Sequence, residues 1–159
     1  MKYRLASSTW DEKEYNAMQQ VIDSGRFTMG EKVSEFESAF AEFFGSKYAI
    51  MLNSGSSANL IAIASLFFRK TNPLKRGDEV IVPAVSWSTT YHPLQQYGLK
   101  CKFVDIDRKS LNFDLAQLEN ALSDKTKAIM AVNLLGNPND FDAINALIAD
   151  IALWNFEYE

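Results

Sequence analysis

The segment from Tyr48 to Phe67 reads YAIMLNSGSSANLIAIASLF and changes character in its middle. Tyr48–Leu52 is apolar and predicts a buried strand. Ala58–Phe68 has high helix propensity and contains neither Gly nor Pro, so it predicts a helix. Between them lies Asn53–Ser57, a short stretch of small and polar residues. The segment therefore predicts a strand, a tight loop and a helix, which is how an α/β unit begins.

The loop itself permits two interpretations. Gly55, Ser56 and Ser57 offer hydroxyls and a backbone that a ligand can approach closely. Free N–H groups at a helix N-terminus, together with the helix dipole, suit a phosphate group. In the other interpretation Ser54 simply caps the helix that follows. The loop lacks the Lys of a Walker motif and the spacing of GxGxxG, so neither nucleotide-binding motif applies.

From residue 47 onward the pattern alternates between strands and helices. We expect strands at Tyr48–Leu52, Glu79–Pro83, Cys101–Asp105 and Ala128–Leu134, and helices at Ala58–Phe68, Thr89–Tyr97, Asp114–Leu122 and Phe141–Ile151. Continuous Val and Ile runs alternating with helices predict an α/β fold, a mostly parallel sheet with helices on both faces. Pro93 must lie in the first turn of its helix or kink it.

Residues 1–46 predict a separate helical segment. Thr9 and Glu12 have the spacing of a capping box that opens a helix ending at Asp23. A second helix is expected over Lys32–Phe44, with Gly45 ending it. Its aromatic side chains repeat at helical spacing and are interpreted as a packing surface: Phe36, Phe40, Phe43 and Phe44.

Composition excludes several classes of protein. The 159 residues are 47% hydrophobic, enough for one ordinary domain with a core. A net charge of −4 without long charged runs gives no basis for expecting nucleic acid or an anionic membrane as partner. One cysteine, Cys101, and one histidine, His92, make a His/Cys zinc site implausible, so no metal is expected. The single cysteine and the absence of an apolar leader predict a cytoplasmic protein.

Ligands of parallel sheets gather at the carboxyl ends of the strands. The polar loops expected there are Asn53–Ser57, Ala84–Thr89, Asp105–Asp107 and Asn133–Asn137. Trp87 is either a buried anchor or a flat surface for a planar ring. Asp105 and Asp107 invite a metal or acid–base role, but we interpret both as caps of their loop.

Six stretches resemble the DegT/DnrJ/EryC1/StrS family: GRFTMG (25–30), FE (36–37), NSGSSAN (53–59), GDEVIVPAVSWSTT (77–90), FVDID (103–107) and VNLLGNPN (132–139). These are pyridoxal-phosphate enzymes of aminotransferase fold type I that act on nucleotide-linked 4-keto sugars. The sequences of these motifs are most similar to those of the 3-dehydratase branch, which acts on GDP- or CDP-linked 4-keto-6-deoxyhexoses. The resemblance covers nearly all of residues 3–149.

The resemblance implies a fold, a cofactor and a site. Residues 47–151 would be an incomplete pyridoxal-phosphate-binding α/β domain, the N-terminal part of the family's large domain. Gly55, Ser56 and Ser57 would hold the phosphate of pyridoxal 5′-phosphate or pyridoxamine 5′-phosphate, and Trp87 would stack on its ring. The segment Phe27, Thr28, Met29 and Gly30 would line the binding site for a nucleotide-linked 4-keto-6-deoxy sugar. This site would lie near the dimer partner. Such a homodimer would serve deoxysugar and lipopolysaccharide biosynthesis.

Residues 152–159 do not resemble the family's continuation, and we interpret them as a non-family tail. The chain offers no match to the family's pyridine-facing Asp, its Schiff-base Lys or the His of the dehydratase branch, so no catalytic residue is assigned. It is interpreted as an N-terminal fragment of a 3-dehydratase or aminotransferase, without turnover by itself. The alternatives are a truncated, inactive domain that keeps the fold and dimer surface, and an unrelated nucleotide-binding α/β domain.

Overall fold

The computed structural model describes residues 7–149 and 154–156, in two compact units, Met1–Leu52 and Asn53–Glu159. The first unit begins with helix α1, Glu12–Ser24. Its capping box uses Asp11, whose side chain accepts from the Lys13 N–H at 2.7 Å, and Glu14, whose carboxylate accepts from the Asp11 N–H at 2.8 Å. The predicted capping box of Thr9 and Glu12 is therefore wrong by two residues. Asp11 and Glu14 have the same spacing, and the Asp11 carboxylate caps the helix.

Helix α2, Glu31–Phe43, follows Gly30 and ends before Gly45, which has φ +64°. The predicted aromatic row forms a ladder in which ring centroids lie 5.6 Å apart for Phe36 and Phe40 and 4.5 Å apart for Phe40 and Phe44. These rings are all at least 45% exposed, and Ala41 is the one residue of the helix that is buried. The ladder is thus an apolar face on the surface of its unit.

The predicted strand at Tyr48–Leu52 does not form. Tyr48 and Ile50 are about three-quarters exposed (74% and 76%), and the Met51 N–H donates to Glu37 Oε1 at 2.8 Å. Apolar residues alone do not make a strand, because the backbone must also find a neighbouring strand to pair with. No described strand pairs with this segment.

The second unit contains the parallel sheet that the sequence predicts. Strands β1 (Glu79–Pro83), β2 (Lys100–Val104), β3 (Thr126–Met130) and β4 (Trp154–Phe156) are ordered β2-β1-β3-β4, and these neighbouring strands pair in parallel. The strand expected at Ala128–Leu134 ends early, since a 3₁₀ turn occupies Leu134–Gly136. Of the predicted tail 152–159, only β4 belongs to the described residues.

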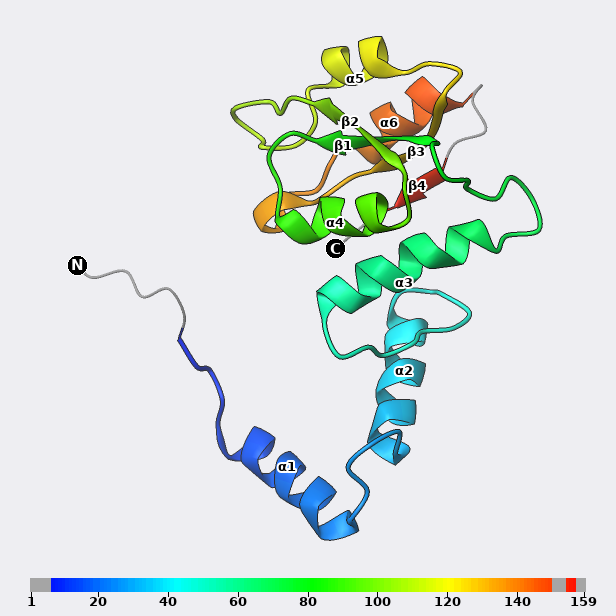
Figure 1. Cartoon of the computed structure of the whole chain (residues 1–159). Coiled ribbons are helices and arrows are strands. Elements are labelled where there is room, and N and C mark those ends of the chain that lie inside the picture. Colours follow the sequence, from blue (N-terminus) through cyan, green and yellow to red (C-terminus); the bar gives the residue numbers. More distant parts are fainter. Residues whose placement is uncertain (1–6, 150–153, 157–159) are drawn as a thin grey trace. The chain divides into compact units, whose positions relative to one another are not determined.

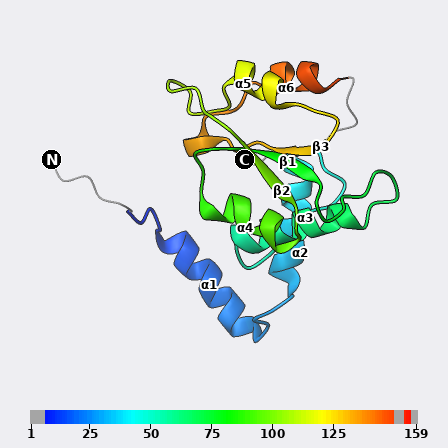
Figure 2. The same ribbon diagram turned by 45° about the horizontal axis from the view of Figure 1, so that its top comes forward.

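Helices cover both faces of this sheet (Figures 1 and 2). Helices α3 (Gly55–Phe67) and α4 (Ser88–Gln96) lie on one face, and α5 (Leu115–Ala121) and α6 (Phe141–Ile148) lie on the other. Strand residues alternate between the two layers: Val80, Val82 and Met130 face α3 and α4, whereas Ile81 and Ile129 face α5 and α6. None of the described helices is long and apolar enough to cross a membrane.

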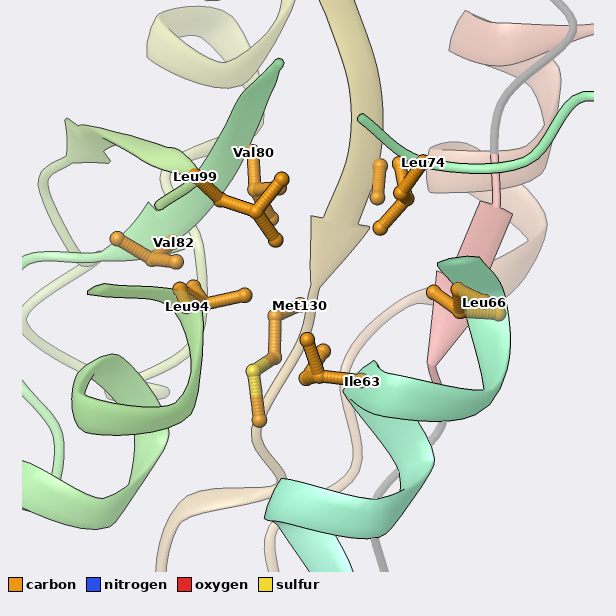
Figure 3. Close-up of a cluster of buried hydrophobic side chains, with 9 residues drawn as sticks. Ile63, Leu66, Leu74, Val80, Val82, Leu94, Leu99 and Met130 are labelled. Atoms are coloured by element: carbon orange, nitrogen blue, oxygen red, sulfur yellow. The ribbon is translucent and has the colours of Figure 1, made fainter. Parts of the chain in front are cut away.

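The core under α3 and α4 fixes the positions of those two helices. Ile63 of α3 and Leu94 of α4 are essentially inaccessible and pack against Met130 and Val82 of the sheet (Figure 3). Full burial of a side chain of this size contributes roughly 1.5–3 kcal/mol. The two helices that carry the predicted site are therefore anchored on one rigid layer.

Candidate functional site

Ser54 caps helix α3. Its Oγ accepts from the Ser57 N–H at 3.1 Å, and its hydroxyl donates to Ser57 Oγ at 3.2 Å. The capping interpretation of Ser54 is therefore confirmed. A cap occupies only one of the free N–H groups at a helix N-terminus, so it does not compete with an anion for the rest.

The donors that remain belong to Gly55 and Ser56. They are the first residues of α3, so their N–H groups have no acceptor within the helix. The Ser57 N–H is already used by Ser54, which leaves its hydroxyl as the group that can reach a ligand. No acidic side chain lies in the first turn, so the positive end of the helix dipole is not neutralised. Backbone donors plus hydroxyls without a competing carboxylate form a donor set that fits a phosphate.

A proline and an asparagine join α3 to α4. Pro93 lies in the second turn of α4, not in the first, and the helix continues past it to Gln96. Proline has no N–H, so the Thr89 carbonyl four residues earlier loses its helical donor. Asn59 Nδ2 of α3 donates to that carbonyl at 3.2 Å, and the Asn59 side chain is buried. This bond joins the second turn of α3 to the first turn of α4.

A hollow of about 180 Å³ lies between these two helices. Its lining residues recur at helical spacing on the facing sides: Ser56, Ser57 and Leu60 from α3, and Thr89, His92, Pro93 and Gln96 from α4. It thus brings the predicted phosphate-binding serines together with the first turns of α4. Asn59 and His92 were not predicted for this site, although the carbonyl that Pro93 leaves free is visible in the sequence.

Trp87 immediately precedes α4 and is 73% exposed. It is therefore not a buried anchor, and its ring has a free face. The loop that carries it is held by two bonds, one of 2.8 Å between the Ser86 and Thr90 hydroxyls and one of 2.8 Å from the Tyr91 hydroxyl to the Pro83 carbonyl. Burial raises the pKa of Tyr91 above its usual value, so this hydroxyl stays a neutral donor.

The remaining carboxyl-end loops meet at a different hollow, of about 450 Å³. Asn137 Nδ2 donates to the Ser110 carbonyl at 2.7 Å, and Asn112 Nδ2 donates to the Pro138 carbonyl at 2.7 Å. Asp107 Oδ1 accepts from the Ser110 N–H at 2.8 Å, from its hydroxyl at 3.0 Å and from the Lys109 N–H at 3.1 Å. Hydrogen bonds from Ser110 lower the pKa of Asp107. Asp107 is thus a loop cap as predicted, and the described residues hold no cluster of three His, Cys, Asp or Glu side chains suited to a metal ion.

The predicted sugar-binding segment belongs to the first unit. Phe27, Thr28 and Gly30 line a hollow of about 130 Å³ together with residues at the end of α1 and the start of α2. Met29 has φ +46° and is 95% exposed. A left-handed backbone is uncommon for a residue other than glycine.

The family model that matches this chain is the DegT/DnrJ/EryC1/StrS aminotransferase family, over residues 8–157. The chain is 67% identical over 147 residues to a GDP-4-keto-6-deoxy-D-mannose 3-dehydratase of Yersinia pseudotuberculosis, which covers 92% of this chain and 37% of that protein. A solved structure of the E. coli GDP-4-keto-6-deoxy-D-mannose 3-dehydratase with bound hydrated PLP is similar with a TM-score of 0.93 and 62% identity, covering 97% of this chain and 40% of that one. A mutant GDP-4-keto-6-deoxymannose 3-dehydratase with bound GDP-perosamine matches with the same TM-score, identity and coverage. The chain thus spans about two-fifths of the length of these relatives.

Proposed function

Since this chain belongs to the DegT/DnrJ/EryC1/StrS aminotransferase family and has the α/β fold of its larger domain, we propose that it forms the phosphate side of the active site of a pyridoxal-phosphate-dependent GDP-4-keto-6-deoxymannose 3-dehydratase. The observation that carries this proposal is the 67% identity to the Yersinia 3-dehydratase over 92% of the chain. That level of identity favours the dehydratase over the aminotransferase and GDP over CDP. Nothing in the described residues favours an inactive domain instead.

In this proposal Gly55, Ser56 and Ser57 hold the cofactor phosphate. The Gly55 and Ser56 N–H groups and the two serine hydroxyls donate to its oxygens, and the α3 dipole favours the negative charge. The exposed ring of Trp87 offers the face on which a pyridine ring can stack. The phosphate donors begin α3 and Trp87 immediately precedes α4, and both helices are anchored to one core, so phosphate and ring are held in a fixed relation.

Pyridoxal phosphate, when bound, supplies an electron sink for bond breaking beside the former 4-keto carbon of the sugar. The described residues contribute binding and orientation to this chemistry. The Asn59–Thr89 bond keeps the two helix N-termini together, so that phosphate and ring cannot move independently. No described residue is assigned the role of catalytic base.

The sugar site and the assembly extend the proposal to the first unit. Phe27, Thr28, Met29 and Gly30 bind the nucleotide-linked 4-keto-6-deoxy sugar, and two copies of the chain associate as a homodimer. The exposed aromatic ladder of α2 supports association, because contiguous apolar surface of this kind marks an interface. A nucleotide-sugar substrate and a single unpaired cysteine support a cytoplasmic location in deoxysugar and lipopolysaccharide biosynthesis.

A chimaera tests the proposed activity directly. Residues 8–149 replace the matching segment of the Yersinia relative, and the product is assayed with pyridoxal phosphate, glutamate and GDP-4-keto-6-deoxymannose. We expect dehydration of this substrate and much slower turnover of the CDP-linked 4-keto-6-deoxyglucose. In the chimaera, Ser56→Ala should reduce cofactor saturation. The matched control is Ser65→Ala, at the far end of α3, which should leave cofactor saturation unchanged. A folded chimaera that binds the cofactor but leaves the GDP-sugar unchanged contradicts the proposed function.

A further inference from the structure

His92 is the single histidine of the chain, and the proposed cofactor contacts do not use it. It lies in the second turn of α4 and lines the 180 Å³ hollow together with Ser56 and Ser57. The two serines hold the phosphate in the proposed function. The hollow therefore places an imidazole beside the expected position of a dianion.

The hollow has no other group that can carry a positive charge. Helix α3 contains no Asp, Glu, Lys, Arg or His, and the remaining lining side chains of α4 are Thr89, Pro93 and Gln96. Neutral donors and a helix dipole stabilise a phosphate, but a cationic donor adds charge-assisted hydrogen bonding. A protonated imidazole is a donor of this kind.

On the basis of the proposed function, we infer that His92 is a further phosphate-binding residue of this site and makes its affinity for a phosphate monoester depend on pH. The protonated imidazole donates to the phosphate from the α4 side, opposite the donors of α3. The affinity for a phosphate monoester then rises as the pH falls, because protonation of the imidazole supplies a charged donor.

The elements packed against α4 contain few other groups that titrate near it. Strand β1 turns Val80 and Val82 toward this layer. Burial raises the pKa of Tyr91 on α4 itself and of the Cys101 thiol on β2, so both stay neutral between pH 5.5 and 7.5. A pH effect that is lost with His92 is therefore assigned to its imidazole.

Nuclear magnetic resonance on the full 159-residue chain tests this inference, because the imidazole signals come from one residue. The probes are inorganic phosphate and pyridoxamine 5′-phosphate, which lacks the aldehyde that would react with surface lysines. We expect the His92 imidazole signals to shift with each probe, and the shift with pyridoxamine phosphate to saturate along with binding measured by Trp fluorescence. In Ser56→Ala the shift should require a higher probe concentration.

The pH profile separates a charge effect from a packing effect. Between pH 7.5 and 5.5 the affinity of the wild type should rise about two- to fivefold more than that of His92→Gln, the factor expected of an exposed ion pair. The second ionisation of the phosphate, near pH 6, affects every variant alike and cancels in this ratio. Gln95→Ala, on α4 outside the hollow, should behave as wild type.

The outcomes distinguish the two proposals. If pyridoxamine phosphate binds but the imidazole signals stay unchanged, or if His92→Gln keeps the full pH profile, the role of His92 is wrong and the proposed function stands. If pyridoxamine phosphate binds neither the folded chain nor the folded chimaera, both proposals fail.

Discussion

The bond between Asn59 and Thr89 predicts an energetic coupling between Asn59 and Pro93, two residues on different helices. In the wild type the Thr89 carbonyl has no helical donor, because residue 93 is proline, and it accepts from Asn59 Nδ2 at 3.2 Å. Asn59→Ala removes this donor and leaves a half-buried carbonyl without a partner. An unsatisfied group of this kind costs roughly 1–3 kcal/mol, and since Thr89 is only partly buried we expect about 1–2 kcal/mol.

Pro93→Ala restores a backbone N–H at position 93, which can donate to the Thr89 carbonyl in ordinary helical geometry. In that background Asn59→Ala should cost less by about 1 kcal/mol, since the carbonyl keeps a donor. The wild type, the two single variants and the double variant form a double-mutant cycle. This cycle subtracts the loss of packing at Pro93, which is buried, and any change in helix propensity, because both are the same with and without Asn59.

The four proteins of this cycle are compared by urea unfolding, followed by circular dichroism. Asn120→Ala is the matched control: it also removes an Asn Nδ2 bond to a carbonyl, at 2.8 Å, but on an exposed helix surface, and should change stability by less than about 0.5 kcal/mol. If Asn59→Ala costs the same in both backgrounds within about 0.3 kcal/mol, the carbonyl does not depend on Asn59 and the account of how α3 and α4 are joined is refuted.

Two further predictions concern the helix N-terminus and the loop after β2. Ser54→Ala should lower the free energy of unfolding by about 1 kcal/mol through loss of the cap. Ser56→Ala should leave the free energy of unfolding unchanged and weaken pyridoxal phosphate binding tenfold to hundredfold, the equivalent of about 1.5–3 kcal/mol. Urea unfolding and cofactor titration of both variants check this, and equal effects of the two substitutions on both quantities would contradict it. For Asp107, whose pKa is lowered from 3.8 by the bonds from Ser110, the carboxylate stabilises the fold above pH 3.8 and loses that effect as the pH falls through the lower folded-state value. The difference in melting temperature between wild type and Asp107→Asn should therefore shrink below pH 3.8, and a difference that stays constant from pH 7 to pH 2.5 would count against this assignment.

Local patterns predicted most of the elements of the second unit. The strand Glu79–Pro83 was predicted with the bounds that the structure has, because its continuous apolar run is bounded by turn residues on both sides. The helix expected at Asp114–Leu122 also forms, as α5, and the Asp114 side chain caps it by accepting from the Gln117 N–H at 3.1 Å. The loop-cap role of Asp107 is equally local and was predicted correctly.

Errors arose where the outcome depends on distant residues. Tyr48–Leu52 has the composition of a strand, but a strand exists only when another strand offers hydrogen bonds, and its composition does not show whether a partner is in reach. The capping box of α1 was misplaced because two overlapping pairs satisfy the same local rule. The site residues Gly55, Ser56, Ser57 and Trp87 came from the motifs and their resemblance to a family, and their cofactor roles stay predictions.

The sequence by itself determined that the second unit is a parallel α/β layer with a serine-rich helix N-terminus, because hydrophobic periodicity and helix capping depend on residues close together in the chain. Only the tertiary structure decided the strand order β2-β1-β3-β4 and the meeting of α3 and α4. It also decided which donors are left where the two helices meet, since Ser54 Oγ accepts from the Ser57 N–H and Asn59 Nδ2 donates to the Thr89 carbonyl that Pro93 leaves without a helical donor. The physical reason is that hydrogen-bond satisfaction is settled over the whole fold: a group left unpaired by local sequence is completed by whichever side chain packing brings within reach.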